Sequence, residues 1–191
     1  MGEFFDDGKR DGSWPCFDGY TAQQSRFGLN LIGKILNDNP DILRIVELGT
    51  GHGGTSLFLG SRICGRGGKV LTIDIAQLMD HSYSSWNLSA QKYNVTFLQK
   101  DVFLPETVQE VSNFIKDHRA LIFCDDGVKK REFPLYAEIL KKDDLLLAHD
   151  YTGEISDKDL TERTLAILEP YRQEEFSPGV LDTRILSMKR R

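Results

Sequence analysis

The stretch RIVELGTGHGGTS, residues 44–56, places four glycines directly behind a short apolar run. Glycine lets a chain turn sharply and lets a ligand approach the backbone N–H groups at the start of a helix, which attract anions. Gly49, Gly51 and Gly54 match the spacing G-x-G-x-x-G, which is typical of dinucleotide-binding folds when it joins a strand to a helix. The stretch therefore predicts a strand, a ligand-binding turn and a helix.

Apolar and helical blocks alternate along the rest of the chain. A first helix is expected from about residue 21 to the Asn39-Pro40 pair. Further helices are expected near 53–64, 83–92, 105–118, 130–141 and 157–169, and strands at 43–48, 69–73, 95–98, 120–124 and 145–148. The strands are almost continuously apolar, as in parallel strands covered on both faces. This alternation predicts an α/β fold, a Rossmann-like three-layer sandwich around a mainly parallel sheet of about seven strands.

The two ends of the chain depart from this alternation. Residues 171–176 and 180–188 are β-like runs joined by Ser177-Pro178-Gly179, which predicts a C-terminal antiparallel hairpin. Residues 1–20 are rich in Gly and Asp with scattered aromatic residues, which indicates an N-terminal loop or lid. We therefore expect a single domain over residues 21–191.

Composition narrows the class of function. The formal net charge of the 191 residues is −5, and this excludes the electropositive surface of a nucleic-acid binder. No apolar run approaches the ~20 residues of a membrane span, and the start of the sequence lacks the apolar core of a signal peptide. The three cysteines fit neither a disulfide framework nor a zinc site. We expect a cytoplasmic protein that acts on a small molecule, without a nucleic-acid or membrane partner, and the sequence leaves its oligomeric state open.

Glu47 decides between two ligands that could use the glycine turn. It lies two residues before Gly49, at the end of an otherwise apolar strand. A carboxylate at this point would repel the pyrophosphate of a dinucleotide and attract the sulfonium and ammonium groups of S-adenosylmethionine. On this argument we expect Glu47 to select S-adenosylmethionine.

Two segments resemble known methyltransferases. ELGTGHGGT, residues 47–55, resembles the first motif of class I S-adenosylmethionine-dependent methyltransferases, (D/E)-x-G-x-G-x-G, with Gly49, Gly51 and Gly53 at its glycine positions. FCDDGVKKREFPLYAEILKKDDLLLAHDY, residues 123–151, resembles the group related to cephalosporin-biosynthesis and macrolide-sugar O-methyltransferases. The resemblance covers roughly residues 43–151 and implies the class I methyltransferase fold with S-adenosylmethionine as its cofactor.

The resemblance also implies a set of cofactor-binding residues. Asp74 ends the strand KVLTID and would bind the ribose diol, and Asp101 would reach the adenine amino group. Asp101 could equally cap the following helix, and a helix cap is the alternative interpretation of Asp74. The full expected set is Glu47, Gly49, Gly51, Gly53, Asp74, Asp101 and Asp125.

Ionisable residues end two neighbouring strands of the expected sheet. Asp125 and Asp126 follow one apolar strand, and His149 and Asp150 follow the next. In an open parallel sheet these groups meet at the carboxyl edge, where gathered carboxylates repel each other unless a cation lies among them. Oxygen ligands of this kind suit Mg²⁺.

The resemblance assigns roles to these groups. It implies Asp125 and Asp150 as metal ligands, with His149 as a third ligand or as the general base that deprotonates a hydroxyl nucleophile. The sequence departs from its relatives in two places, with Asp126-Gly127 where they often carry Gly-Asp-His, and with His149 where some have a glutamate.

The favoured function is O-methylation of a small hydroxylated acceptor, with a sugar as one candidate, by an S-adenosylmethionine-dependent methyltransferase assisted by a divalent metal. Two alternatives stay open. An NAD-dependent oxidoreductase would share the glycines and Asp74, and a non-catalytic cofactor-binding subunit would keep the cofactor site without turnover.

Overall fold

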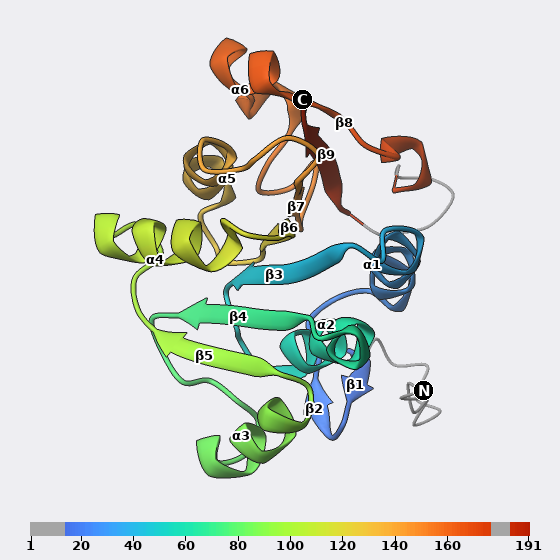
Figure 1. The fold of residues 1–191 in the computed structure, drawn as a ribbon, viewed down its shortest axis with the longest axis vertical. Helices are drawn as coiled ribbons and strands as arrows, with labels where there is room; N and C mark the ends of the chain where they lie inside the picture. Colours follow the sequence, from blue (N-terminus) through green and yellow to red (C-terminus); the bar gives the residue numbers. More distant parts are fainter. Residues whose placement is uncertain (1–13, 177–183) are drawn as a thin grey trace.

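The computed structural model describes residues 14–176 and 184–191, and its centre is one twisted sheet (Figure 1). The strands are β3 (Ile42–Leu48), β4 (Lys69–Asp74), β5 (Val95–Gln99), β6 (Arg119–Cys124), β7 (Leu145–Ala148), β8 (Leu168–Pro170) and β9 (Leu186–Arg190). They lie in the order β5-β4-β3-β6-β7-β9-β8. The strands β3 to β7 run parallel, and β9 runs antiparallel to both β7 and β8. The predicted fold class is confirmed.

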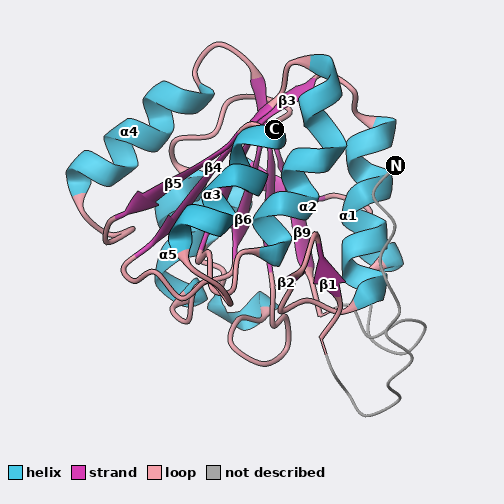
Figure 2. Cartoon of the chain, turned by 90° about the horizontal axis from the view of Figure 1, so that it is seen from below, coloured by secondary structure: helices cyan, strands magenta, loops and turns pink. Residues whose placement is uncertain are grey.

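Helices cover both faces of the sheet, as Figure 2 shows. One face carries α1 (Arg26–Asp38), α2 (Gly54–Ile63) and α3 (Tyr83–Lys92), and the other carries α4 (Pro105–Ile115), α5 (Lys129–Ala137) and α6 (Glu162–Ile167). Short 3-10 helices follow at Cys64–Arg66, Asp157–Asp159 and Gln173–Glu175. Within residues 14–176 and 184–191, no helix has the length and apolar character needed to cross a bilayer.

Local sequence signals explain where the helices begin. Ser25 caps α1, because its hydroxyl accepts a hydrogen bond from the Gly28 N–H at 3.0 Å. Pro105 occupies the first turn of α4, where its missing N–H costs little.

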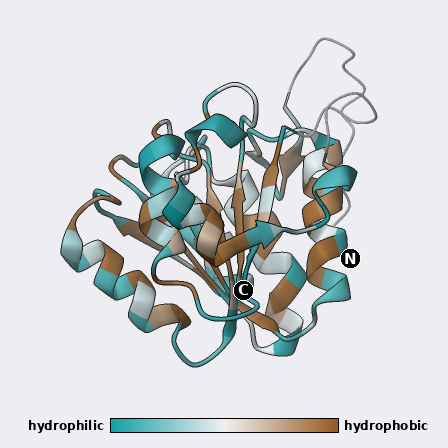
Figure 3. Cartoon of the chain, turned by 90° about the horizontal axis from the view of Figure 1, so that it is seen from above, coloured by the Kyte–Doolittle hydropathy of each residue, from teal (hydrophilic) through white to brown (hydrophobic). Residues whose placement is uncertain are grey.

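The core consists of two apolar layers, one on each side of the sheet. Figure 3 shows that hydrophobic residues, drawn in brown, concentrate along the central strands. Successive residues of a strand point to opposite faces, so Ile45 of β3 packs toward α1 and α2, whereas Val46 packs toward α4 and α5. Because both faces are covered, both residues are fully buried. This burial is the reason that the strands are almost continuously apolar in sequence.

The C-terminal antiparallel pair is present, but its first strand comes from an earlier segment than expected. The predicted helix over 157–169 is instead a 3-10 turn, the six-residue α6 and then β8, which pairs with β9. Residues 171–176 contain a 3-10 helix rather than a strand. Pro170 ends β8 on the sheet edge, where its missing N–H costs no ladder hydrogen bond. The expected turn at 177–179 and the start of the second run lie outside the described residues.

The N-terminal segment also differs from the expected loop or lid. Residues 1–13 lie outside the described residues, but β1 (Cys16–Phe17) and β2 (Tyr20–Thr21) form a small antiparallel hairpin. Phe17 and Tyr20 are buried in the core, and their hairpin contacts α2, so the hairpin is part of the core. The expected boundary at residue 20 therefore falls inside a packed element.

Candidate active site

A cavity of about 580 Å³ lies at the carboxyl ends of the parallel strands. It sits where β3 and β6 are neighbours, between the two halves of the sheet, which is the usual ligand position in such folds. Its lining residues include Gly49, Gly51, Asp74, Asp125, Asp126, Lys129, His149, Asp150 and Glu154.

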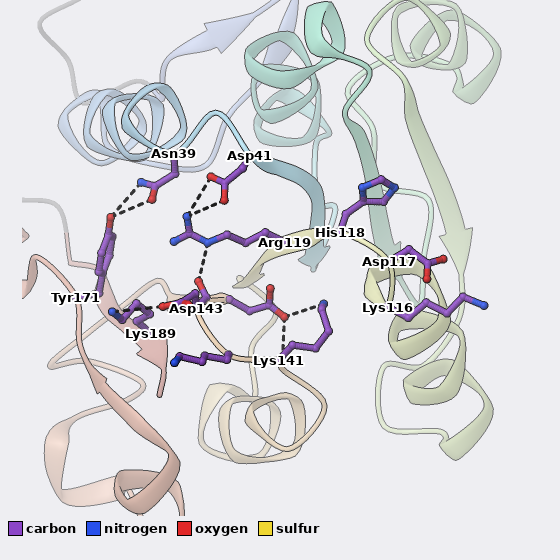
Figure 4. A pocket seen from close by; sticks show the side chains of 12 residues that line it. Asn39, Asp41, Lys116, Asp117, His118, Arg119, Lys141, Asp143, Tyr171 and Lys189 are labelled. Atoms are coloured by element: carbon purple, nitrogen blue, oxygen red, sulfur yellow. Dashed lines mark hydrogen bonds and ion pairs between the residues drawn. The ribbon is translucent and has the colours of Figure 1, made fainter.

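A second cavity of similar volume lies at the opposite edge of the sheet, and Figure 4 shows its side chains. Its charges are largely paired with one another. Arg119 lies 3.1 Å from Asp41, and Lys141 lies 3.0 Å from Asp144. These ion pairs stabilise the amino ends of the strands. The glycine turn lines only the first of these two cavities, so we place the functional site there.

The glycine turn brings its backbone against the neighbouring strand. Gly49 has a φ of +96°, and a Cβ atom at this position would lie 2.7 Å from the Asp125 carbonyl oxygen. Gly53 has a φ of +87°, and a Cβ atom there would collide with the Trp86 indole. Only glycine accommodates both the backbone conformation and these close approaches.

Glu47 does not face the cavity. Its side chain is fully buried and its carboxylate accepts hydrogen bonds from the hydroxyls of Ser56 and Thr72, the latter at 2.6 Å. Burial raises the pKa of Glu47 to about 8, despite these hydrogen bonds. Because Glu47 is buried away from the cavity and burial favours its neutral form, this geometry does not support selection of the ligand by the charge of Glu47, and its role in cofactor binding stays a prediction. Glu47 instead anchors the first turn of α2 beneath the glycine turn.

Asp74 and Asp101 have different surroundings. Asp74 lines the cavity, and its Oδ2 accepts hydrogen bonds from the N–H groups of Thr50 and Gly51, both at 3.0 Å. Asp101 lies outside the set of described residues that line the cavity, and its carboxylate accepts the Phe103 N–H at 2.8 Å. Asp74 therefore fixes the shape of the glycine turn, while Asp101 closes a local turn ahead of α4.

The residues that end β6 and β7 do meet. His149 Nδ1 lies 3.2 Å from Asp125 Oδ1 and 3.5 Å from Asp150 Oδ2. Gln24, just ahead of α1, donates a hydrogen bond from Nε2 to Asp125 Oδ2 at 2.7 Å. Burial raises the pKa of Asp125, although His149 and Gln24 favour its charged form.

Lys129 completes this cluster. It is the first residue of α5, its side chain is 3% exposed, and its ammonium lies 3.8 Å from Asp150 Oδ2 and 2.7 Å from Glu154 Oε2. Burial by itself lowers the pKa of Lys129, but the Glu154 hydrogen bond and the nearby Asp125 and Asp150 charges raise it overall. Lys129 and Gln24 were not among the predicted site residues. The available signal for Lys129 was a cation in the first turn of a helix, where the dipole disfavours it.

The arrangement of the cluster does not match the predicted metal centre. In residues 14–176 and 184–191, no three His, Cys, Asp or Glu side chains are arranged to hold a metal ion. Asp125, His149 and Asp150 have the donor chemistry that a divalent cation uses. An ammonium already lies beside Asp150, so their predicted role as metal ligands is not supported by this geometry.

The family model for rhamnosyl O-methyltransferase/CmcI matches residues 29–165, more than half of the chain. The chain belongs to this family. It is therefore a class I S-adenosylmethionine-dependent methyltransferase, as the resemblance implied, and its broad activity is O-methylation. Membership in the rhamnosyl O-methyltransferase/CmcI family removes the support for an NAD-dependent oxidoreductase.

Solved structures agree with the family at the level of the fold. CmcI with S-adenosylhomocysteine has a TM-score of 0.67 at 16% identity, and covers 97% of this chain and 87% of CmcI. A CmcI complex with Mg and S-adenosylmethionine has a TM-score of 0.71 at 16% identity, with coverages of 98% and 81%. A putative O-methyltransferase from Nostoc punctiforme has a TM-score of 0.57 at 6% identity, with coverages of 85% and 55%. Comparison with curated proteins gives no significant match.

Proposed function

We propose that this rhamnosyl O-methyltransferase/CmcI family member moves the methyl group of S-adenosylmethionine to a hydroxyl of a small acceptor in the 580 Å³ cavity. The observation that carries the proposal is the meeting of the glycine turn with Asp74, Asp125 and His149 at one cavity at the carboxyl edge of the sheet. The volume is ordinary for a site that binds small molecules. The family name makes a sugar hydroxyl our candidate acceptor.

The cofactor would lie over the glycine turn. Gly49, Gly51 and Gly53 would let its amino acid part approach the backbone N–H groups at the start of α2. Asp74 would bind the ribose hydroxyls with its remaining acceptor capacity, and Asp125 would lie near the sulfonium end. Asp101 stays a predicted contact of the adenine, as the resemblance implied. Glu47 would act indirectly, by holding α2 in place.

His149 is the proposed general base. Asp125 and Asp150 both lie near Nδ1, so they favour a proton on this atom and leave Nε2 free to accept one. In the proposed step the acceptor oxygen forms a bond to the methyl carbon while the carbon–sulfur bond breaks. The bonding pair stays on the sulfur, which becomes the neutral thioether, and the hydroxyl proton moves to His149 Nε2.

Two observations suggest Mg²⁺, the acidic residues gathered at the carboxyl ends of the strands and the CmcI complex that contains the ion. The donor chemistry of Asp125, His149 and Asp150 suits such an ion, but their arrangement around Lys129 does not. We therefore assign no step to a metal. The three cysteines are free thiols, which supports a reducing compartment such as the cytoplasm.

Calorimetric titration with S-adenosylhomocysteine tests the cofactor site. We expect one binding site per chain, and an absence of binding to folded protein would overturn the proposal. Radiolabelled S-adenosylmethionine with a panel of hydroxylated sugars then tests the acceptor. Binding of S-adenosylhomocysteine without methyl transfer to any hydroxylated acceptor would favour the alternative of a non-catalytic cofactor-binding subunit.

A further inference from the structure

Lys129 has an unusual position for a lysine. Its side chain is 3% exposed, although lysine is among the residues least often buried. It also begins α5, where the helix dipole disfavours a positive charge. Its neighbours Lys130 and Arg131 share the same first turn, and the Lys130 side chain is 58% exposed. Specific partners must therefore offset the free-energy cost of burying the Lys129 ammonium.

Oxygen atoms provide that compensation. The Lys129 ammonium donates hydrogen bonds to the Asp126 carbonyl oxygen at 2.6 Å and to Glu154 Oε2 at 2.7 Å, and it lies 3.8 Å from Asp150 Oδ2. These oxygens come from the two loops that follow β6 and β7. A backbone carbonyl and two carboxylates form the kind of set that hard divalent cations collect.

One N–H of the ammonium has no protein partner in the part of the chain that the structure describes. An ammonium has three N–H donors, and the Asp126 and Glu154 hydrogen bonds use two of them. The distance to Asp150 is too long for a third hydrogen bond. Because the Lys129 side chain lines the cavity, this third donor is available to an oxygen atom of a ligand.

We propose that Lys129 is the resident cation of this active site, occupying the position that a divalent metal would need and donating its third N–H to the acceptor hydroxyl oxygen. The first part of this inference concerns only the cluster of Lys129, Asp126, Asp150 and Glu154. The second part rests on the proposed function. A fixed positive charge beside the acceptor oxygen would favour the loss of its proton to His149.

The charge arrangement has a direct consequence for metal binding. A divalent ion at Asp150 and Glu154 would lie within a few ångströms of the ammonium, and like charges at that range repel strongly. The ion and the ammonium therefore exclude each other. Removing the ammonium leaves two uncompensated carboxylates and a carbonyl oxygen, so it should create a divalent-cation site.

Mn²⁺ is a suitable probe, because its binding can be followed both by calorimetry and by its electron paramagnetic resonance signal. We would titrate Mn²⁺ into the wild type, Lys129→Met and Lys130→Met at one pH and ionic strength. Lys130 is the matched control, because it is the next residue of α5 and pairs with Asp159 at 2.9 Å. We expect Lys129→Met to bind Mn²⁺ at least about tenfold more tightly than the wild type, and Lys130→Met to match the wild type.

Two results would overturn the inference. One is tight Mn²⁺ binding by the wild type that Asp150→Asn abolishes, and the other is a folded Lys129→Met that binds Mn²⁺ no better than the wild type. Circular dichroism establishes the fold of each variant, and Lys129→Gln replaces Lys129→Met if the latter unfolds. The first result needs only the wild type and Asp150→Asn, so it does not depend on the folding of any Lys129 variant.

S-adenosylhomocysteine titrations in parallel separate this inference from the proposed function. If the wild type fails to bind S-adenosylhomocysteine, the proposed function fails, while the Mn²⁺ titrations still decide whether Lys129 holds the cation position. Conversely, tight Mn²⁺ binding by the wild type that Asp150→Asn abolishes defeats the inference and leaves the cofactor proposal intact.

Discussion

Substitution of Gly49 by alanine tests whether the glycine turn is fixed by its contact with the neighbouring strand. The Cβ of Gly49→Ala would lie 2.7 Å from the Asp125 carbonyl oxygen and 2.7 Å from the Asp126 nitrogen, both backbone atoms that cannot turn away. The left-handed φ of +96° adds strain of about 1–2 kcal/mol for any residue with a Cβ. Overpacking against a backbone adds about 1–3 kcal/mol. We expect a total loss of about 2–5 kcal/mol in the free energy of unfolding.

Gly67→Ala is the matched control for this experiment. Gly67 has a similar φ of +78°, but nothing lies within 4 Å of a Cβ built there. The free energy of unfolding of Gly67→Ala should therefore fall only by the cost of the backbone strain, about 1–2 kcal/mol. For a chain of this size the melting temperature should fall by about 2–8 °C in Gly67→Ala and about 4–20 °C in Gly49→Ala.

Urea unfolding and calorimetry with S-adenosylhomocysteine provide the two measurements. We expect S-adenosylhomocysteine affinity to fall in Gly49→Ala and to stay at the wild-type value in Gly67→Ala, which lies away from the cavity. Equal losses of stability in the two variants would refute the reasoning, since the backbone contact would then contribute nothing beyond the left-handed conformation.

Three further predictions follow from the same site. Folding raises the pKa of Glu47 from 4.5 to about 8. Between pH 4.5 and about 8, the folded state therefore keeps a proton on Glu47 that the unfolded state has lost. The free energy of unfolding should fall as pH rises through this window, by about 1 kcal/mol per pH unit, and Glu47→Gln should remove that part of the slope in urea titrations. His149→Ala should lower the methyl-transfer rate by about 10²–10⁴-fold and keep S-adenosylhomocysteine binding, whereas His118→Ala should change neither. Trp86→Phe should lose about 2–4 kcal/mol in urea unfolding, because it removes the buried indole hydrogen bond to the Gly53 carbonyl at 3.2 Å.

Each of these predictions has a result that contradicts it. An unchanged pH slope in Glu47→Gln would show that the buried carboxyl is ionised in the folded protein. Full methyl-transfer activity in His149→Ala would remove this histidine from the proposed step. Wild-type stability in Trp86→Phe would show that the indole does not support the glycine turn.

Sequence patterns predicted most of the fold, because parallel strands that are buried on both faces have nearly continuous apolar sequences. Four of the six residues in the run 43–48 are apolar, on both faces of the sheet, because helices cover both faces, and this pattern can be read from the local sequence. The hairpin of β8 and β9 was predicted from the right part of the chain but with the wrong first strand. Pairing with β9 decides that residues 168–170 are extended, and such pairing cannot be read from their own composition.

The candidate site was likewise predicted only in part from the sequence. The sequence by itself determined that a glycine turn, Asp125, His149 and Asp150 would meet at one edge of the sheet, because the carboxyl ends of parallel strands share an edge. Only the tertiary structure decided that Glu47 turns inward to Ser56 and Thr72. Side-chain direction at the end of a strand depends on which polar partners pack above it, and these partners come from other elements.

The burial of Lys129 also depends on the tertiary structure and could not be predicted from the sequence alone. The sequence shows three adjacent cations at the start of a helix, and it does not distinguish the buried one from the two beside it. The loop after β7 selects Lys129, because it brings Glu154 and Asp150 to the side of α5 on which this ammonium lies. Charged residues on segments that are distant in sequence pair only when the neighbouring strands bring their loops together. That arrangement of the strands is a property of the tertiary structure.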